Sequence, residues 1–347
     1  MMIDPSKIII ATQCSPVEPF KSEVIRLFKS INSFGGNLAN AKKVVCLSES
    51  PDSNFKNELK LLKVKIKLID PLDEYYHHSN KIQMLQIEDD YDVLIALDTD
   101  VIVTRDFTDY IDKNKISAKI VDTDCLGLEN WEKLFNFFKL DVPVKRFQTC
   151  ITNVKTIPWF NSGVLFIPKK YSLILYKLWI EYNKKLLENY YSLSFLSGDS
   201  FNDDSNFIFI DQYALALSIH DLKLFYNPLP LEFNFPTHYS IHPDFLPQNV
   251  EPFLIHYHHR LTKFQNVMHC FYSKVNQSID SVNSKINFNY LNKIDYELLV
   301  DDCYIKILDR FADKEGLKYY AHLLDTQIIT VNSLEKILTD SDEFKNK

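Results

Sequence analysis

The feature that most constrains the fold is a short apolar run that ends in two carboxylates. Val93 to Leu97 has strand length and β-branched content, as expected for a buried parallel strand, and Asp98-Thr99-Asp100 follows directly. Side chains alternate along an extended chain, so we expect Asp98 and Asp100 to point the same way and to accommodate a divalent cation. Ligands of open α/β sheets gather at the carboxyl ends of strands. This pair is therefore the first candidate for chemistry.

Length and composition exclude several classes of protein. A chain of 347 residues can form one large domain and a small one. The net charge of -7, without a dense basic stripe, argues against a nucleic-acid partner. No apolar run approaches the roughly 20 residues that span a bilayer, and residues 1–7 contain no signal-peptide core. We expect no transmembrane segment and a cytoplasmic location, with peripheral attachment at the inner membrane face left open.

The positions of the cysteines and glycines exclude several common kinds of binding and catalytic site. The six cysteines are scattered without a Cys-x-x-Cys pair, which indicates reduced thiols. The six glycines form neither a dinucleotide-binding fingerprint nor a phosphate-binding loop. A Gly-x-Ser-x-Gly nucleophile elbow is also absent. A nucleotide-binding site in this chain would therefore have to be built without these glycine-rich motifs.

Hydrophobic periodicity predicts alternating strands and helices. The expected strands include residues 7–13, 43–47, 64–69, 93–97, 159–167, 222–226 and 253–258, and the expected helices include 19–34, 81–88, 171–190 and 211–220. This alternation predicts an α/β fold with a mostly parallel sheet. We expect a main domain over residues 1–263, a polar linker over 264–292 and a small helical domain over 293–347.

Polar residues interrupt or end several of these segments. Asn161-Ser162-Gly163 breaks an apolar strand, and a glycine there allows a ligand to approach closely. Asp211-Gln212 opens a helix, where the aspartate could equally be an N-cap. His256 lies near a strand end, on the face shared with His258, whereas His259 is expected on the other face. These residues are candidates for a site together with the Asp98 and Asp100 pair.

An ordered set of these residues resembles family 8 glycosyltransferases of the GT-A fold. The set covers roughly residues 7 to 260 and consists of Lys81, Asp98-Thr99-Asp100, Asn161-Ser162-Gly163, Asp211-Gln212, Leu229-Pro230 with Asn234, and His256. The resemblance implies a nucleotide-diphospho-sugar transferase fold with a mixed, mostly parallel central sheet flanked by helices. The last segment, with Asp309-Arg310 and Asp313 to Gly316, resembles the small helical domain DUF4214.

The resemblance also implies a donor and a set of site residues. The metal ligands would be Asp98, Asp100 and His256, and two carboxylates with one imidazole suit Mn²⁺, with Mg²⁺ as the other choice. The resemblance implies a nucleotide-diphosphate sugar donor, most simply a UDP-sugar, a glycan, lipid-linked glycan or glycoprotein acceptor, and retention of anomeric configuration. Further donor contacts would come from Thr12, Gln13, Lys81 and Thr99, and catalytic contacts from Asn161, Asp211 and Gln212.

One departure from the family concerns the segment after His256. Family members carry a glycine and a Lys-Pro-Trp stretch there, whose lysine binds the diphosphate, whereas this chain reads Tyr257-His258-His259-Arg260 and onward to Lys263. Arg260 or Lys263 could replace that lysine. The sequence therefore leaves the diphosphate contact open.

Two other functions remain open at the sequence level. An Asp-x-Asp pair after an apolar strand, with Asp199, Asp203 and Asp204 downstream, also fits a haloacid-dehalogenase-like phosphatase with an aspartate nucleophile. A non-catalytic carbohydrate-binding protein could keep the GT-A fold without turnover. Metal-dependent binding of a nucleotide would favour the transferase, and phosphoester turnover would favour the phosphatase.

Overall fold

The computed structural model describes residues 3–73, 75–197, 206–238, 249–262, 265–286, 296–308, 310–325 and 328–345. Two compact units divide the chain, one formed by residues 1–260 with 269–286 and the other by 261–268 with 287–347. Among the helices in these ranges, none combines the length and the apolar character needed to cross a membrane.

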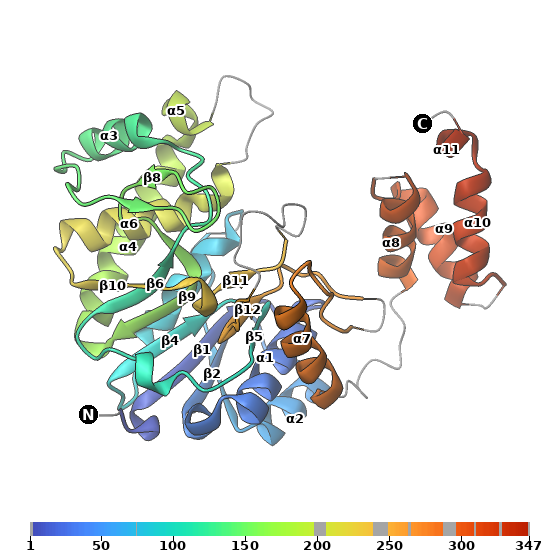
Figure 1. Cartoon of the computed structure of the whole chain (residues 1–347), viewed down its shortest axis with the longest axis horizontal. Coiled ribbons are helices and arrows are strands. Elements are labelled where there is room, and N and C mark those ends of the chain that lie inside the picture. Colours follow the sequence, from blue (N-terminus) through green and yellow to red (C-terminus); the bar gives the residue numbers. More distant parts are fainter. Residues whose placement is uncertain are drawn as a thin grey trace. The chain divides into compact units, whose positions relative to one another are not determined.

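A seven-stranded sheet forms the centre of the first unit (Figure 1). The strand order is β10-β6-β9-β4-β1-β2-β3, and only β9 runs antiparallel to its two neighbours. Its strands are β1 (Ile8–Cys14), β2 (Lys42–Leu47), β3 (Val64–Leu68), β4 (Val93–Leu97), β6 (Ile116–Ile120), β9 (Phe160–Pro168) and β10 (Tyr226–Leu229). The predicted mixed, mostly parallel sheet is therefore confirmed.

A second, three-stranded sheet joins distant parts of the chain. Its strands are β5 (Val101–Val103), β11 (Phe235–Pro236) and β12 (Leu254–His256), in the order β11-β12-β5. The antiparallel register of β12 and β5 places His256 opposite Val101, and the Tyr257 N–H donates to the Asp100 carbonyl at 3.0 Å. This pairing carries His256 to the end of the Asp98-Thr99-Asp100 turn. A short hairpin of β7 (Phe147–Gln148) and β8 (Lys155–Thr156) completes the strands.

Helices cover both faces of the central sheet, with α1 and α2 on one side and α4 and α6 on the other (Figure 1). On the side of α4 and α6, the hydrophobic core includes the buried side chains of Trp131, Trp159, Trp179 and Tyr213. The α-helices are α1 (Phe20–Phe34), α2 (Ser53–Leu61), α3 (Leu128–Phe137), α4 (Lys169–Asn189), α5 (Ser194–Ser197), α6 (Ile210–Asp221) and α7 (Ser273–Lys285). The 3₁₀ helices are η1 (Pro5–Lys7), η2 (Gly36–Asn40), η3 (His77–Gln86), η4 (Thr108–Tyr110), η5 (Tyr190–Ser192), η6 (Phe207–Phe209) and η7 (Leu231–Phe233).

Several local expectations differ from the structure. Helix α2 lies where the sequence analysis placed no element, and the helix expected over 81–88 is instead the 3₁₀ helix η3, which starts earlier. The strand expected over 222–226 begins only at Tyr226. Thr99 and Asp100 form a turn, so Asp98 and Asp100 do not lie on a continuous extended strand as we predicted. The turn allows β5 to leave the central sheet and pair with β12.

The segment expected as a linker contains α7. Its Val275, Ile279 and Val282 are buried in the first unit, so three apolar residues at helical spacing outweigh the polar composition of this stretch. The second unit contains α8 (Tyr296–Leu308), α9 (Lys314–Asp325), α10 (Val331–Asp340) and α11 (Asp342–Lys345), which pack around Val300 and Leu334. The helical character predicted for this part of the chain is confirmed.

Candidate active site

A cleft of about 620 Å³ in the first unit collects most of the predicted site residues. Its volume lies within the range of small-molecule sites. Of the predicted residues, it is lined by Gln13, Lys81, Asp98, Thr99, Asp100, Asn161, Asp211, Gln212 and His256. Thr12 is fully buried on β1 and does not line the cleft, because its side chain points to the face opposite to that of Gln13. Lys263 lies outside the described residues.

Three side chains in the cleft form a group suited to a metal ion. One ligand atom from each of Asp98, Asp100 and His256 lies within 4.8 Å of the others. The His256 Nε2 atom is 3.0 Å from Asp100 Oδ1. Burial by itself would raise the pKa of Asp100, but the neighbouring His256 charge and hydrogen bond lower it below its usual value. The Asp100 carboxylate therefore remains charged in a buried place, as a ligand of a cation must.

An amide chain orients the His256 ring. Asn234 Oδ1 lies 3.1 Å from His256 Nδ1 and can only accept, so Nδ1 carries a proton and Nε2 faces the carboxylates. The Asn234 side chain in turn donates to Asn161 Oδ1 at 2.9 Å. Histidines that bind metals commonly donate their other N–H to such a partner. The donor set and its orientation therefore fit a divalent cation.

Gly163 provides the space between these ligands. The Asp98 N–H donates to the Gly163 carbonyl at 2.9 Å, so β9 passes directly beside the carboxylate turn. A Cβ atom at Gly163 would lie 2.8 Å from His256 Cε1 and 3.0 Å from Asp98 Oδ2. Real Cβ atoms do not approach other atoms this closely without displacing them. Residue 163 must therefore be a glycine, because His256 and Asp98 lie too close to its backbone to leave room for a Cβ atom.

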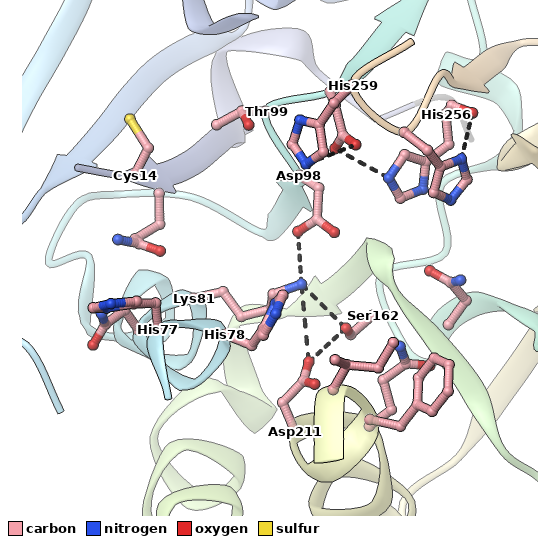
Figure 2. Close-up of a pocket in the computed structure, with 18 of the residues that line it drawn as sticks. Cys14, His77, His78, Lys81, Asp98, Thr99, Ser162, Asp211, His256 and His259 are labelled. Carbon is pink, nitrogen blue, oxygen red and sulfur yellow. Dashed lines mark hydrogen bonds and ion pairs between the residues drawn. The ribbon is translucent and has the colours of Figure 1, made fainter. Parts of the chain in front are cut away.

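A second network lies on the other side of Asp98 (Figure 2). Lys81 Nζ lies 2.7 Å from Asp98 Oδ1 and 3.2 Å from Ser162 Oγ, and the Ser162 hydroxyl donates to Asp211 Oδ2 at 2.7 Å. The Tyr76 hydroxyl donates to Asp211 Oδ1 at 2.9 Å. Burial by itself would lower the pKa of Lys81, but Asp98 and Asp211 outweigh it and raise the pKa. Lys81 is therefore a largely buried cation in contact with the candidate metal site.

Sequence reasoning missed a third group of residues. Glu23 is fully buried on α1 and accepts from the Thr99 hydroxyl at 2.6 Å and from His259 Nδ1 at 2.6 Å. The hydrogen bond to Glu23 raises the pKa of His259 to about 9. A glutamate within the apolar face of a helix was the available signal, because a buried carboxylate needs a partner. Tyr76 was also missed, and no local pattern marks it.

Comparison with solved structures identifies the fold. A galactosyltransferase, LgtC, solved with donor and acceptor sugar analogues, matches with a TM-score of 0.50 and 14% identity over 80% of this chain and 95% of that chain. An active-site mutant of the same enzyme matches with a TM-score of 0.50 and 12% identity over 79% and 95%. The fold is therefore GT-A, as the resemblance to family 8 predicted. A comparison with curated proteins found no match.

Comparison with protein families covers most of the chain. The DUF4214 domain matches residues 283–347, which confirms the second predicted resemblance. The Rhodobacterales glycosyltransferase domain matches residues 22–223, a range that includes Lys81, both aspartates of the metal group, and Asp211. More than half of the chain lies within this match. The chain therefore belongs to the Rhodobacterales glycosyltransferase domain family.

Proposed function

We propose that the protein is a metal-dependent glycosyltransferase that uses a nucleotide-diphosphate sugar, first of all a UDP-sugar. The acceptor would be a glycan, a lipid-linked glycan or a glycoprotein. The observation that carries the proposal is the group of Asp98, Asp100 and His256 in the wall of a cleft large enough for such a donor. Membership of a glycosyltransferase family supports the reaction class.

The candidate metal is Mn²⁺, with Mg²⁺ as the second choice. Two carboxylates suit both ions, and the imidazole of His256 favours Mn²⁺. When bound, the ion would act as a Lewis acid that neutralises the negative charge developing on the departing diphosphate. The hydrogen bond from Nδ1 to Asn234 keeps the His256 ring turned toward the carboxylates. The chain would thus hold the ion by three residues.

The other residues of the cleft suggest separate roles in binding the donor. Lys81 lies against Asp98 and can contact the donor sugar or phosphates from that side. Both carboxylate oxygens of Asp211 already accept hydrogen bonds, from Tyr76 and Ser162, so we assign Asp211 a positioning role. Gln212 Oε1 has no hydrogen-bond partner among the described residues and lines the cleft. We therefore favour Gln212 over Asp211 for direct contact with the sugar.

Two further assignments concern Asn161 and the stereochemistry of the transfer. We propose that Asn161 contacts the sugar or acceptor hydroxyls, since it lines the cleft beside Asn234. We propose retention of configuration on the resemblance to family 8 alone. The GT-A fold argues against the phosphatase alternative, whose downstream aspartates lie outside the described residues.

The first test is a thermal-shift screen of the protein against UDP, GDP, CDP and ADP, each with and without Mn²⁺. A ligand that binds only the folded state raises the melting temperature, by an amount equivalent to about 2.7 kcal/mol at 100 times its Kd. We expect stabilisation by one nucleotide that depends on the metal. If none of the four shifts the melting temperature, the donor assignment is wrong.

Asp100→Ala tests the metal group directly. We expect loss of Mn²⁺-dependent nucleotide binding, because the variant removes one of three ligands, while the fold persists. Asp109→Ala is the matched control, because Asp109 is exposed outside the cleft. Unchanged Mn²⁺ dependence in Asp100→Ala would refute the site. A wild-type protein that binds the nucleotide sugar but neither hydrolyses nor transfers it would favour the carbohydrate-binding alternative.

A further inference from the structure

The chain after β12 adopts an unusual backbone beside the candidate metal group. His258 and His259 have φ values of 49° and 57°, in the left-handed region that residues with a Cβ rarely adopt. Two consecutive residues in this region need support from their surroundings, and such backbone strain clusters at functional sites. The support here includes the contact between His259 and Glu23.

Glu23 and His259 form a pair fixed to the carboxylate turn. The Glu23 carboxylate is fully buried, and its two oxygens accept from Thr99 and from His259 Nδ1, each at 2.6 Å. A buried carboxylate without partners would be strongly destabilising, so this pairing holds the imidazole in one orientation. The His259 side chain itself is 56% exposed and lines the cleft.

The second ring nitrogen of His259 faces the candidate metal group. Nε2 lies 3.7 Å from Asp100 Oδ2, too far for a hydrogen bond. In Figure 2 the Asp98 carboxylate lies between Lys81 on one side and His259 on the other. The group of potential metal ligands contains atoms of Asp98, Asp100 and His256 and not of His259. His259 therefore presents a donor next to the metal group without belonging to it.

The neighbouring basic residue is placed differently. The Arg260 guanidinium donates to the Thr237 backbone carbonyl, and Arg260 does not line the cleft. Lys81 also lines the cleft, but it approaches from the opposite side of Asp98 and belongs to a segment before β12 (Figure 2). His258 also lines the cleft, but its ring stacks on that of His256 with centroids 3.8 Å apart, and its Nδ1 lies 3.0 Å from the His256 carbonyl oxygen. His259, whose Nε2 faces Asp100, is thus the better placed of the two to meet an anion held at the metal group.

We propose that His259, oriented by Glu23, donates a hydrogen bond from Nε2 to the β-phosphate of the donor. The inference rests on the proposed function and assigns a residue that selects a diphosphate over a monophosphate. Because Nδ1 donates to Glu23, a ring that also donates from Nε2 carries a positive charge, which strengthens its hydrogen bond to a phosphate oxygen. Glu23 acts as a positioning residue.

The test compares UDP with UMP by isothermal titration calorimetry of the full chain at saturating Mn²⁺. We expect His259→Ala to weaken UDP binding roughly 10- to 100-fold, the effect of losing one hydrogen bond to a charged group. UMP affinity should change by less than about threefold, because the monophosphate lacks the contacted group. Glu23→Gln should lower the same UDP to UMP ratio. His269→Ala is the control, since His269 is half-exposed and paired with Asp280 outside the cleft.

Other outcomes would overturn the inference. Equal losses of affinity for UDP and UMP would show that His259 does not distinguish a diphosphate from a monophosphate. A loss of Mn²⁺ affinity in His259→Ala without nucleotide, measured by electron paramagnetic resonance of the free ion, would instead make His259 a metal ligand. Unchanged UDP binding in His259→Ala, with wild-type protein binding UDP and Mn²⁺ together, would overturn this inference alone. Failure of the wild-type protein to bind UDP would overturn the donor proposal as well.

Discussion

Gly163 shows how one missing side chain shapes the metal group. The space for its Cβ is bounded by His256 Cε1 at 2.8 Å and Asp98 Oδ2 at 3.0 Å. We therefore predict that Gly163→Ala displaces a ligand and lowers Mn²⁺ affinity roughly 10- to 100-fold, as perturbed supporting residues of metal sites do. Gly127→Ala is the control: its Cβ meets nothing within 4 Å but its φ of 76° is strained. It should lower stability and leave Mn²⁺ titrations unchanged.

Tyr76 does not line the cleft, but it supports Asp211, which does. Its hydroxyl donates to Asp211 Oδ1 and accepts from the Asp211 N–H at 3.0 Å. Tyr76→Phe would leave these buried groups without that partner, so we expect a loss of about 1–3 kcal/mol in the free energy of unfolding. Urea denaturation measures it. Tyr75→Phe, at an 88% exposed side chain, should stay within about 0.5 kcal/mol of wild type, and a similar small change for Tyr76→Phe would contradict the network.

At the scale of elements, α2 illustrates a helix defined by its cap. Asp52 Oδ1 accepts from the Phe55 N–H at 2.8 Å, and Phe55 and Leu59 are buried one turn apart. Removing an N-cap side chain costs about 1 kcal/mol, so Asp52→Ala should lower the free energy of unfolding by that amount. Asp52→Asn keeps an acceptor and should lose much less. Equal losses for the two variants would argue against the cap.

The same cap predicts a pH dependence. Hydrogen bonding to Phe55 N–H and the Lys21 ammonium lowers the pKa of Asp52. A carboxyl group whose pKa is lowered by folding stabilises the protein above its unfolded pKa and loses that contribution as pH falls through the folded pKa. The stability difference between wild type and Asp52→Ala should therefore be full at neutral pH and shrink below about pH 4. Thermal unfolding of both proteins at several pH values measures this difference in stability. A difference that does not change with pH would show that the ionised carboxylate does not stabilise the cap.

At the scale of the whole molecule, α7 decides where the transferase domain ends. Val275, Ile279 and Val282 are fully buried in the first unit, Tyr272 packs edge-on against Phe235 with ring centres 5.5 Å apart, and Lys274 pairs with Glu251 at 2.8 Å. Each buried apolar side chain contributes about 1.5–3 kcal/mol at most. We propose that the domain extends to Ile286 and not to residue 263.

Two truncations test this boundary. A chain of residues 1–286 should fold and keep Mn²⁺-dependent nucleotide binding, because the cleft lies within the first unit. A chain ending at residue 263 should unfold at a clearly lower temperature, because removal of α7 exposes its apolar partners. Equal melting temperatures for the two truncations would instead support a domain that ends at residue 263, as expected from the sequence.

Local patterns determined much of this protein. The apolar run before Asp98 specified a buried strand, period-2 and period-3.6 patterns located most strands of the central sheet and the helices α1, α4 and α6, and the ordered motif set named the GT-A fold. Most predicted site residues indeed line one cleft. These features depend on neighbours in sequence, where burial and backbone geometry repeat with a known period. The polar composition of residues 273–285 hid α7 because only three of its residues face the core.

Only the tertiary structure decided which distant groups meet. The pairing of β12 with β5 set His256 beside Asp100, 156 positions away, and β9 placed Gly163 against Asp98. Glu23 and His259 are separated by 236 positions and share no motif. Side-chain contacts of this kind follow from strand pairing and packing across the whole domain, which no local period encodes. The sequence by itself thus determined the class of fold and named the residues of the candidate metal group, whereas the three-dimensional packing brought those residues together and determined which others support them.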